Sequence, residues 1–247
     1  MKQFIFIITI LFSSFFFSCK KKETATTPTS GSITIKIENQ VDGQNVSFNN
    51  IIYTNANGNK YSISTLKYYL SNLVFTKTDG TIYSANNYNL IDASDANKIS
   101  FTLNNIPNGV YNNLKLYIGI DQSHNHSGVQ SGDLDPMYGM IWSWNTGYIF
   151  FKHEGSYVDT AGKIQPLIFH YGTDAALATA QMPINVDVEG NAKTVYLKFN
   201  LNNLYKSPYQ INFNQYNDQQ STTQADSIWI VKLKTNFANT FSFDKTE

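Results

Sequence analysis

Apolar and polar residues alternate along most of the chain, which is the period-2 pattern of strands with one buried face. The first clear case is Ile33, Ile35 and Ile37, which alternate with polar residues. Similar patterns predict strands in the ranges 46–53, 61–64, 66–78, 82–83, 99–103, 110–120, 167–171, 184–188 and 195–201. No convincing helix separates the first six strands, so the pattern predicts an all-β fold, either an antiparallel sandwich or a barrel.

Turn signals support this reading. Asn57-Gly58 and Asp79-Gly80 are typical of hairpin turns, and Pro107-Asn108-Gly109 indicates a further turn. Near the C-terminus, residues 225–237 fit either a last strand or a short helix, and we expect a short helix after Asp226.

The N-terminus has the pattern of a targeting segment. Lys2 precedes an apolar run over residues 4–17, and Ser18-Cys19 follow directly. This pattern resembles a bacterial lipoprotein signal, in which residues 1–18 are removed and Cys19 becomes the lipidated first residue. The alternative is a cleaved secretory signal with an incidental cysteine.

The predicted anchor determines the domain organisation. We expect residues 19–31 to form a polar tether and residues 32–247 to form one β domain. The protein is then expected in the cell envelope, lipid-anchored to a bacterial membrane through Cys19, on the periplasmic side or at the cell surface.

Charge composition excludes one class of function. The chain has 18 basic and 18 acidic residues, and every basic one is lysine. Strong nucleic-acid binding normally needs a basic face and forked guanidinium contacts, so nucleic acid is not an expected partner.

The candidate chemistry is concentrated in residues 121–155. This stretch holds three of the four histidines, two of the three tryptophans, and the methionines Met137 and Met140. Imidazole nitrogen, thioether sulfur and indole are typical of a site for a soft or borderline transition metal, with copper first.

Two histidines form an H-x-H pair. In an extended segment His124 and His126 would point to the same side, where both could bind one ion. The alternative is a pair of exposed histidines in a polar loop.

A second candidate is the wall formed by Met140, Trp142 and Trp144. These residues would share one face of a strand, and they could line a metal site or simply pack in the core.

Carboxylates near the histidine pair raise the possibility of calcium. Asp121 opens an oxygen-rich loop, but His126 replaces the glycine and Gly132 replaces the glutamate of an EF-hand loop. We therefore favour turn capping by Asp121, Asp133 and Asp135 over a calcium site.

The other two histidines have simpler readings. His170 lies between Phe169 and Tyr171 and could be a buried core histidine, whereas His153 alternates with Lys152 and is expected at the surface. No nucleophile motif surrounds Ser131 or Ser143, and H-E-x-x-H is absent, which leaves a His-x-His zinc hydrolase as the weakest alternative.

Longer strings resemble a known family. Residues 119–155, which contain GDLDP followed by M-x-W-x-W and GY, are similar to the MbnP-like family, as are FHYG at 169–172 and the segments 66–75 and 106–121. This family comprises periplasmic or surface copper-binding proteins related to the partner protein of methanobactin operons.

The resemblance implies a β-sandwich that binds copper, with a tryptophan that is oxidised to kynurenine in some members by a dihaem enzyme of the MbnH type. Transferred to this sequence, Trp142 or Trp144 would be the oxidised residue. His170 would be the best imidazole ligand, because it lies in the matching H-x-G string, whereas His124 and His126 lie in a more variable loop.

The resulting hypothesis is a membrane-anchored, all-β copper-binding protein in metal acquisition or storage, without catalytic turnover. Its candidate ligands are His170, His124, His126, Trp142, Trp144 and Met140. The main rival is a surface lipoprotein that binds a glycan or protein through its aromatic loop, with no metal.

Overall fold

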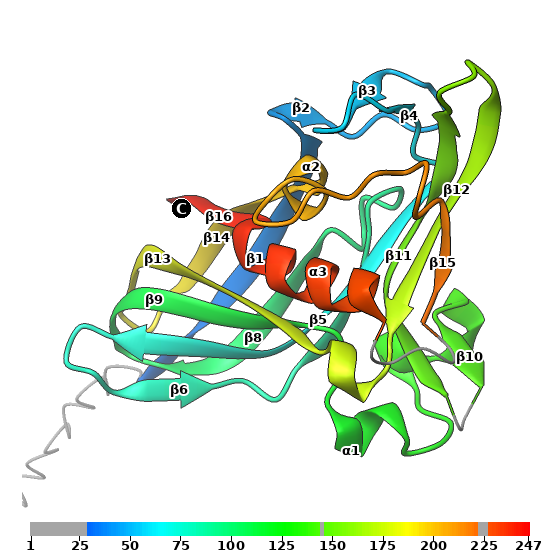
Figure 1. Cartoon of the computed structure of the whole chain (residues 1–247). Coiled ribbons are helices and arrows are strands. Elements are labelled where there is room, and N and C mark those ends of the chain that lie inside the picture. The colour runs from blue at the N-terminus through cyan, green and yellow to red at the C-terminus, as the bar shows by residue number, and fades with distance from the viewer. Residues whose placement is uncertain (1–28, 144–145, 222–226) are drawn as a thin grey trace, which may run out of the picture.

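The computed structural model describes residues 29–143, 146–221 and 227–247, and it shows two curled β-sheets packed on each other (Figure 1). The predicted all-β sandwich is therefore confirmed. The expected signal peptide, Cys19 and most of the tether lie outside the described residues.

The smaller sheet carries the first long strand. Its members are β1 (Ser30–Val41), β2 (Gln44–Asn45), β8 (Ser100–Pro107), β14 (Ala192–Asn200) and β16 (Phe241–Thr246). They follow the order β16-β14-β1-β2, and β8 also pairs with β1.

The larger sheet carries the candidate chemistry. Its members are β3 (Tyr53–Thr54), β4 (Lys60–Tyr61), β5 (Thr65–Lys77), β6 (Ile82–Ser84), β7 (Tyr88–Asp92), β9 (Gly109–Ile118), β10 (Ile141–Ser143), β11 (Gly147–Val158), β12 (Ile164–Gly172), β13 (Ala178–Val188) and β15 (Asp218–Gln220). The main path runs β13-β9-β5-β11-β12-β15, and β10 pairs with β11.

The helices are short. They are α1 (Gln122–Asn125), α2 (Leu201–Leu204), α3 (Ile228–Asn236) and the 3-10 turns η1 (Gly132–Leu134), η2 (Pro136–Tyr138), η3 (Asp174–Ala176) and η4 (Phe237–Asn239). The predicted C-terminal helix is confirmed as α3. Figure 1 shows α1 and β10 together at the lower end of the molecule. Within the described ranges, no helix is both long and apolar enough to span a membrane.

Most of the predicted strands are present, and the Asn57-Gly58 and Asp79-Gly80 turns join paired strands. Residues 46–53 and 61–64 are exceptions, because only Tyr53 and Tyr61 of these ranges lie in strands. Asn49, within the first range, has a left-handed φ of 66°. Two pairings, β1 with β14 and β12 with β15, are parallel. Alternation alone does not indicate strand direction, since parallel and antiparallel partners can bury the same face.

Aromatic side chains fill the core between the sheets. The rings of Tyr68 in β5 and Phe199 in β14 lie 4.7 Å apart between centroids, which joins the two sheets directly. Further along the same face of the larger sheet, Trp229 of α3 packs against Phe169 and Tyr171 of β12 at 6.2 and 6.3 Å between ring centroids. These contacts make β12 a rigid support for the residues that alternate with them.

Candidate functional site

Alternation along β11 and β12 separates a core face from an outer face. Phe151 and His153 in β11 are buried on the inner side, whereas Lys152 and Glu154 point outward. Lys152 is paired with His170 on β12, so the imidazole of His170 shares the outer face with Glu154.

His170 is held from one side only. Its Nε2 lies 2.8 Å from Oε1 of Glu154, and its side chain is 14% exposed. Its Nδ1 is buried, and no described residue supplies a hydrogen-bond partner for it. The alternative of a core histidine is wrong, because Phe169 and Tyr171 take the inward positions and leave His170 on the other face.

Glu154 is itself fixed by several contacts. Burial raises the pKa of its carboxyl, but hydrogen bonds from His170 and Thr65 and the nearby Lys152 charge lower the pKa by more, so it lies below its usual value. The carboxylate therefore faces His170 as a hydrogen-bond acceptor.

Trp142 of β10 lies next to His170 along this face. Gly172 lies two positions after His170 in β12. Side chains at these two positions project from the same face of the strand, with about 7 Å between them. A Cβ atom added at Gly172 would lie 2.8 Å from Cζ3 of Trp142. The indole of Trp142 thus covers the position next to His170, and its buried Nε1 has no hydrogen-bond partner within the described ranges.

The residue after Gly172 is strained. Thr173 has a φ of 83°, which a β-branched residue rarely adopts, and its buried Oγ1 has no partner among the residues the structure describes. Three buried polar atoms, from Trp142, His170 and Thr173, thus lack a hydrogen-bond partner among the described residues. Buried polar groups are normally hydrogen-bonded, and these three belong to residues that lie within two positions of Gly172 or whose ring covers it, which makes this part of the outer face a candidate ligand site.

His126 contacts the turn that follows Gly172. Its Nε2 lies 3.1 Å from both carboxylate oxygens of Asp174, which follows Thr173 in sequence. The neighbouring Asn125 is buried, donates to Asp174 at 2.7 Å and accepts from the backbone N–H of Tyr148 at 2.8 Å. Asn125 therefore fixes the histidine loop against the start of β11.

His124 faces elsewhere. Its Nδ1 lies 2.8 Å from the hydroxyl of Tyr88 and 3.0 Å from Oδ1 of Asp121, and its ring lies 4.2 Å from that of Tyr88 between centroids. The expectation that His124 and His126 share one side is wrong, because α1 makes this segment helical and residues two apart in a helix diverge.

Asp121 accepts several hydrogen bonds. It caps α1 by accepting from the backbone N–H of His124, as the capping interpretation predicts, and it also accepts from the hydroxyls of Tyr88 and Ser123. Partial burial raises the pKa of the Asp121 carboxyl, but these bonds lower it by more, to well below its usual value. Partial burial and the Asp121 carboxylate raise the pKa of Tyr88 to about 12.

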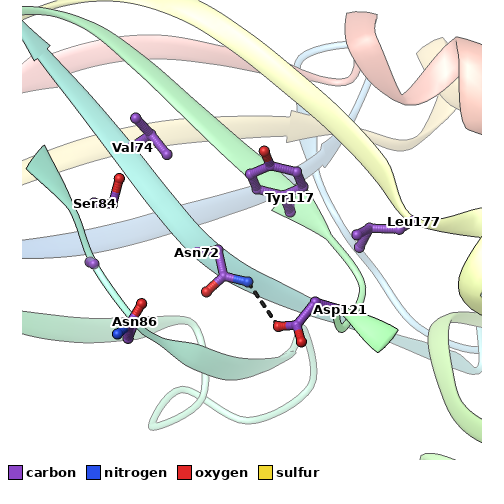
Figure 2. Close-up of a pocket in the computed structure, with 8 residues that line it drawn as sticks. Asn72, Val74, Ser84, Asn86, Tyr117, Asp121 and Leu177 are labelled. Atoms are coloured by element: carbon purple, nitrogen blue, oxygen red, sulfur yellow. Dashed lines mark hydrogen bonds between the residues drawn. The ribbon is translucent and has the colours of Figure 1, made fainter. Parts of the chain in front are cut away.

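A surface pocket opens beside Asp121. Figure 2 shows Asn72 and Asp121 joined by a hydrogen bond at its edge, with Tyr117 and Leu177 also in the lining. Its volume is about 370 Å³. The pocket is lined by neither His170 nor Trp142, so it is separate from the cluster around Gly172.

The expectation that His153 lies at the surface is wrong. His153 is fully buried, because strand alternation places Lys152 on the outer face and His153 on the core face. Its Nδ1 lies 2.6 Å from the hydroxyl of Tyr205. Burial lowers its pKa to about 4, so it is a neutral structural histidine at physiological pH.

Met140 is 1% exposed and belongs to the hydrophobic core, as the packing interpretation predicts. Trp144 lies outside the described residues.

Among the residues that are described, no group of three or more His, Cys, Asp and Glu side chains is arranged to hold a metal ion. A metal site among these residues would therefore have no preformed cluster of three carboxylates or histidines.

Sequence reasoning did not single out Glu154, Gly172, Thr173 or Asp174. Along β11, Phe151 faces the core and Lys152 lies on the outer face. Continuing this alternation could have placed Glu154 on the outer face as well. The contacts of Gly172 and the strain at Thr173 depend on tertiary structure and have no local signal.

Comparison with known proteins gives one consistent result. A family model described as MbnP matches residues 30–227. The structure is similar to that of MbnP from Methylosinus trichosporium, with a TM-score of 0.50 and 16% sequence identity over 72% of this chain and 78% of that one. At this identity the structural match shows the fold alone. No curated protein matches the chain.

Proposed function

The chain belongs to the MbnP family, and from that premise we propose that it is a membrane-anchored copper-binding protein in metal acquisition or storage, without catalytic turnover. The anchor is the lipid on Cys19, and the metal site is built around His170.

One observation carries the metal proposal. His170 Nδ1 is buried and has no hydrogen-bond partner within the described part of the chain, and the same holds for Trp142 Nε1 and Thr173 Oγ1, whose residues cover or follow Gly172. A buried imidazole nitrogen without a partner is costly unless something accepts its lone pair, and a borderline transition metal does so. The donor set therefore fits copper better than calcium, which prefers several oxygen ligands.

The residues have different roles in this proposal. His170 supplies the first nitrogen, and Trp142 supplies an apolar wall that excludes water and disfavours ions with tightly held hydration shells. His126 is the second candidate imidazole, because Asp174 holds it at the turn that follows Gly172. His124 is a weaker candidate, because Tyr88 and Asp121 already engage its Nδ1.

Trp142 is also the indole that we propose for oxidation to kynurenine by a dihaem enzyme of the MbnH type. With peroxide or O2 as the oxidant, the C2–C3 bond of the indole would break with one oxygen atom added at each carbon, and hydrolysis would release C2 as formate. The indole nitrogen would remain as an aromatic amine and C3 would become a ketone, so the side chain would offer nitrogen and oxygen donors beside His170. Trp144 is the alternative target.

Protein purified from its native compartment provides the test. Elemental analysis should find copper, intact-mass measurement should find the lipid, and peptide mapping across residues 137–152 should locate any modified tryptophan. The His170→Ala variant, purified in parallel, should carry much less copper. A metal-free wild-type protein with unmodified tryptophans would contradict the proposal.

A second candidate is a surface module that binds a glycan or protein. It is favoured by the pocket beside Asp121, whose lining includes the Tyr117 ring and the amides of Asn72 and Asn86 (Figure 2). Glycan binding that is lost in Tyr117→Ala and kept in His170→Ala would support it.

A further inference from the structure

We propose that Glu154 is a positioning residue that keeps the proton of the neutral His170 ring on Nε2, so that Nδ1 is the nitrogen presented to the metal. This inference rests on the proposed copper function. It adds the ligand atom and the residue that selects it.

The register of the sheet brings the two side chains together. His170 is paired with Lys152, and Glu154 lies two positions further along β11 on the same face. Such diagonal neighbours across antiparallel strands are within reach of long side chains. The resulting distance of 2.8 Å between Nε2 and Oε1 is that of a strong charge-assisted hydrogen bond.

Glu154 has little freedom to turn away. Thr65 of the adjacent strand β5 donates its hydroxyl to Oε2 at 3.0 Å, and Lys152 Nζ lies 3.3 Å from Oε1. Both carboxylate oxygens are thus engaged by donors, and the carboxylate meets the imidazole as an acceptor.

A carboxylate oxygen that faces Nε2 selects one tautomer. With the proton on Nε2 the contact is a hydrogen bond, whereas with the proton on Nδ1 two lone pairs would face each other across 2.8 Å. Nδ1 has no partner among the described residues in either tautomer, so the contact at Nε2 decides between them. The Nε2–H form keeps a hydrogen bond to a carboxylate, and it is therefore favoured.

The other ring nitrogen then has a free lone pair. Nδ1 is buried on the side away from Glu154, and no described residue hydrogen-bonds to it. Metal-bound histidines usually donate their second ring N–H to a carboxylate or carbonyl, which fixes the ring and raises its basicity. Glu154 is placed to do this for His170 before any metal arrives.

The test begins with the metal-free full-length mature protein. Long-range 1H–15N NMR, recorded well above the usual histidine pKa of about 6.5, reports which ring nitrogen carries the proton. The wild type should show His170 protonated on Nε2. In Glu154→Gln the amide can present either an acceptor or a donor, so His170 should become a mixture of both forms.

A matched control removes a different imidazole–carboxylate contact. Asp174→Asn alters the partner of His126 and should leave the His170 signals unchanged. Copper(I) competition titrations should then show roughly a 10- to 100-fold loss of affinity for Glu154→Gln, which is typical when the partner of a metal-bound histidine is removed.

The outcomes separate the inference from the copper function. A copper-binding wild type with His170 protonated on Nδ1, or a Glu154→Gln variant with unchanged tautomer and affinity, overturns the inference alone. If the wild type binds no copper at all, the proposed function fails, and the ligand role of Nδ1 fails with it.

Discussion

The six-membered ring of Trp142 lies where a side chain at Gly172 would be. A Cβ at position 172 would be 2.8 Å from Cζ3 and 3.0 Å from Cη2 of Trp142, and 2.5 Å from the backbone oxygen of Tyr148. Only glycine permits this contact, although no left-handed φ is involved. The H-x-G string at residues 170–172 therefore combines a candidate ligand with the space for the indole beside it.

The variant Gly172→Ala tests this packing. We expect it to lower the free energy of unfolding by about 1 to 3 kcal/mol, because the added methyl overpacks against a backbone oxygen and the indole. Urea unfolding measures the loss, and tryptophan fluorescence should change as Trp142 is displaced. The control Gly162→Ala adds a Cβ with nothing within 4 Å. Its φ of 75° strains an alanine and lowers stability, so only its emission spectrum is compared, and that should stay as in the wild type. Unchanged emission in Gly172→Ala would contradict the contact.

Asn125 is expected to anchor the histidine loop. Asn125→Ala leaves the buried N–H of Tyr148 without its acceptor, which should cost about 1 to 3 kcal/mol. Hydrogen exchange at the Tyr148 amide should accelerate, and His126 should gain mobility. Asn125→Asp keeps the acceptor but places a second carboxylate beside Asp174, so adding Asp174→Asn should restore part of its stability. Slow exchange at Tyr148 in Asn125→Ala would argue against this role.

His153 predicts a specific loss of stability in acid. Its folded-state pKa of about 4 lies below the unfolded value of about 6.5, so the unfolded chain binds the extra proton first. Stability from this group is complete above pH 6.5 and decreases as the pH falls toward 4, by about 2 to 3 kcal/mol at pH 4.5.

His153→Gln does not titrate and can still hydrogen-bond to Tyr205. Its unfolding free energy should fall less than that of the wild type between pH 7.5 and pH 4.5. Parallel pH profiles for the two proteins would show that His153 is not the group responsible.

Copper affinity should rank the histidines by their surroundings. His170→Ala should reduce binding most, because it removes the nitrogen that has no hydrogen-bond partner among the described residues. His126→Ala should have a smaller effect, and His124→Ala the smallest, because Tyr88 and Asp121 hold that ring on another side. Competition titrations with a copper(I) chelator measure the order. A larger loss for His124→Ala than for His170→Ala would place the site elsewhere.

Local patterns were sufficient for much of the fold. The alternation of Ile33, Ile35 and Ile37 and the turns at Asn57-Gly58 and Asp79-Gly80 identify strands and hairpins, because burial of one face and a left-handed turn are local requirements. The parallel pairing of β1 with β14 was not predictable, since it joins segments about 160 residues apart.

The candidate site shows the same limit. Sequence identified His170 and Trp142, but it misjudged His153 because Lys152 and His153 alternate across the sheet and only one of the two can face solvent. It also treated residues 124–126 as extended, although Asp121 caps a helical turn there. The contact between Glu154 and His170 depends on the register of β11 against β12, which no local pattern specifies.

The central claim is that copper is bound at Nδ1 of His170, beside Trp142. The most direct measurement is anomalous scattering at the copper edge from crystals of the copper(I)-loaded mature protein. The account predicts one strong peak at bonding distance from Nδ1 of His170, with Nε2 still on Glu154. A peak at His124, at the Glu154 side of the ring, or at no protein nitrogen would contradict it.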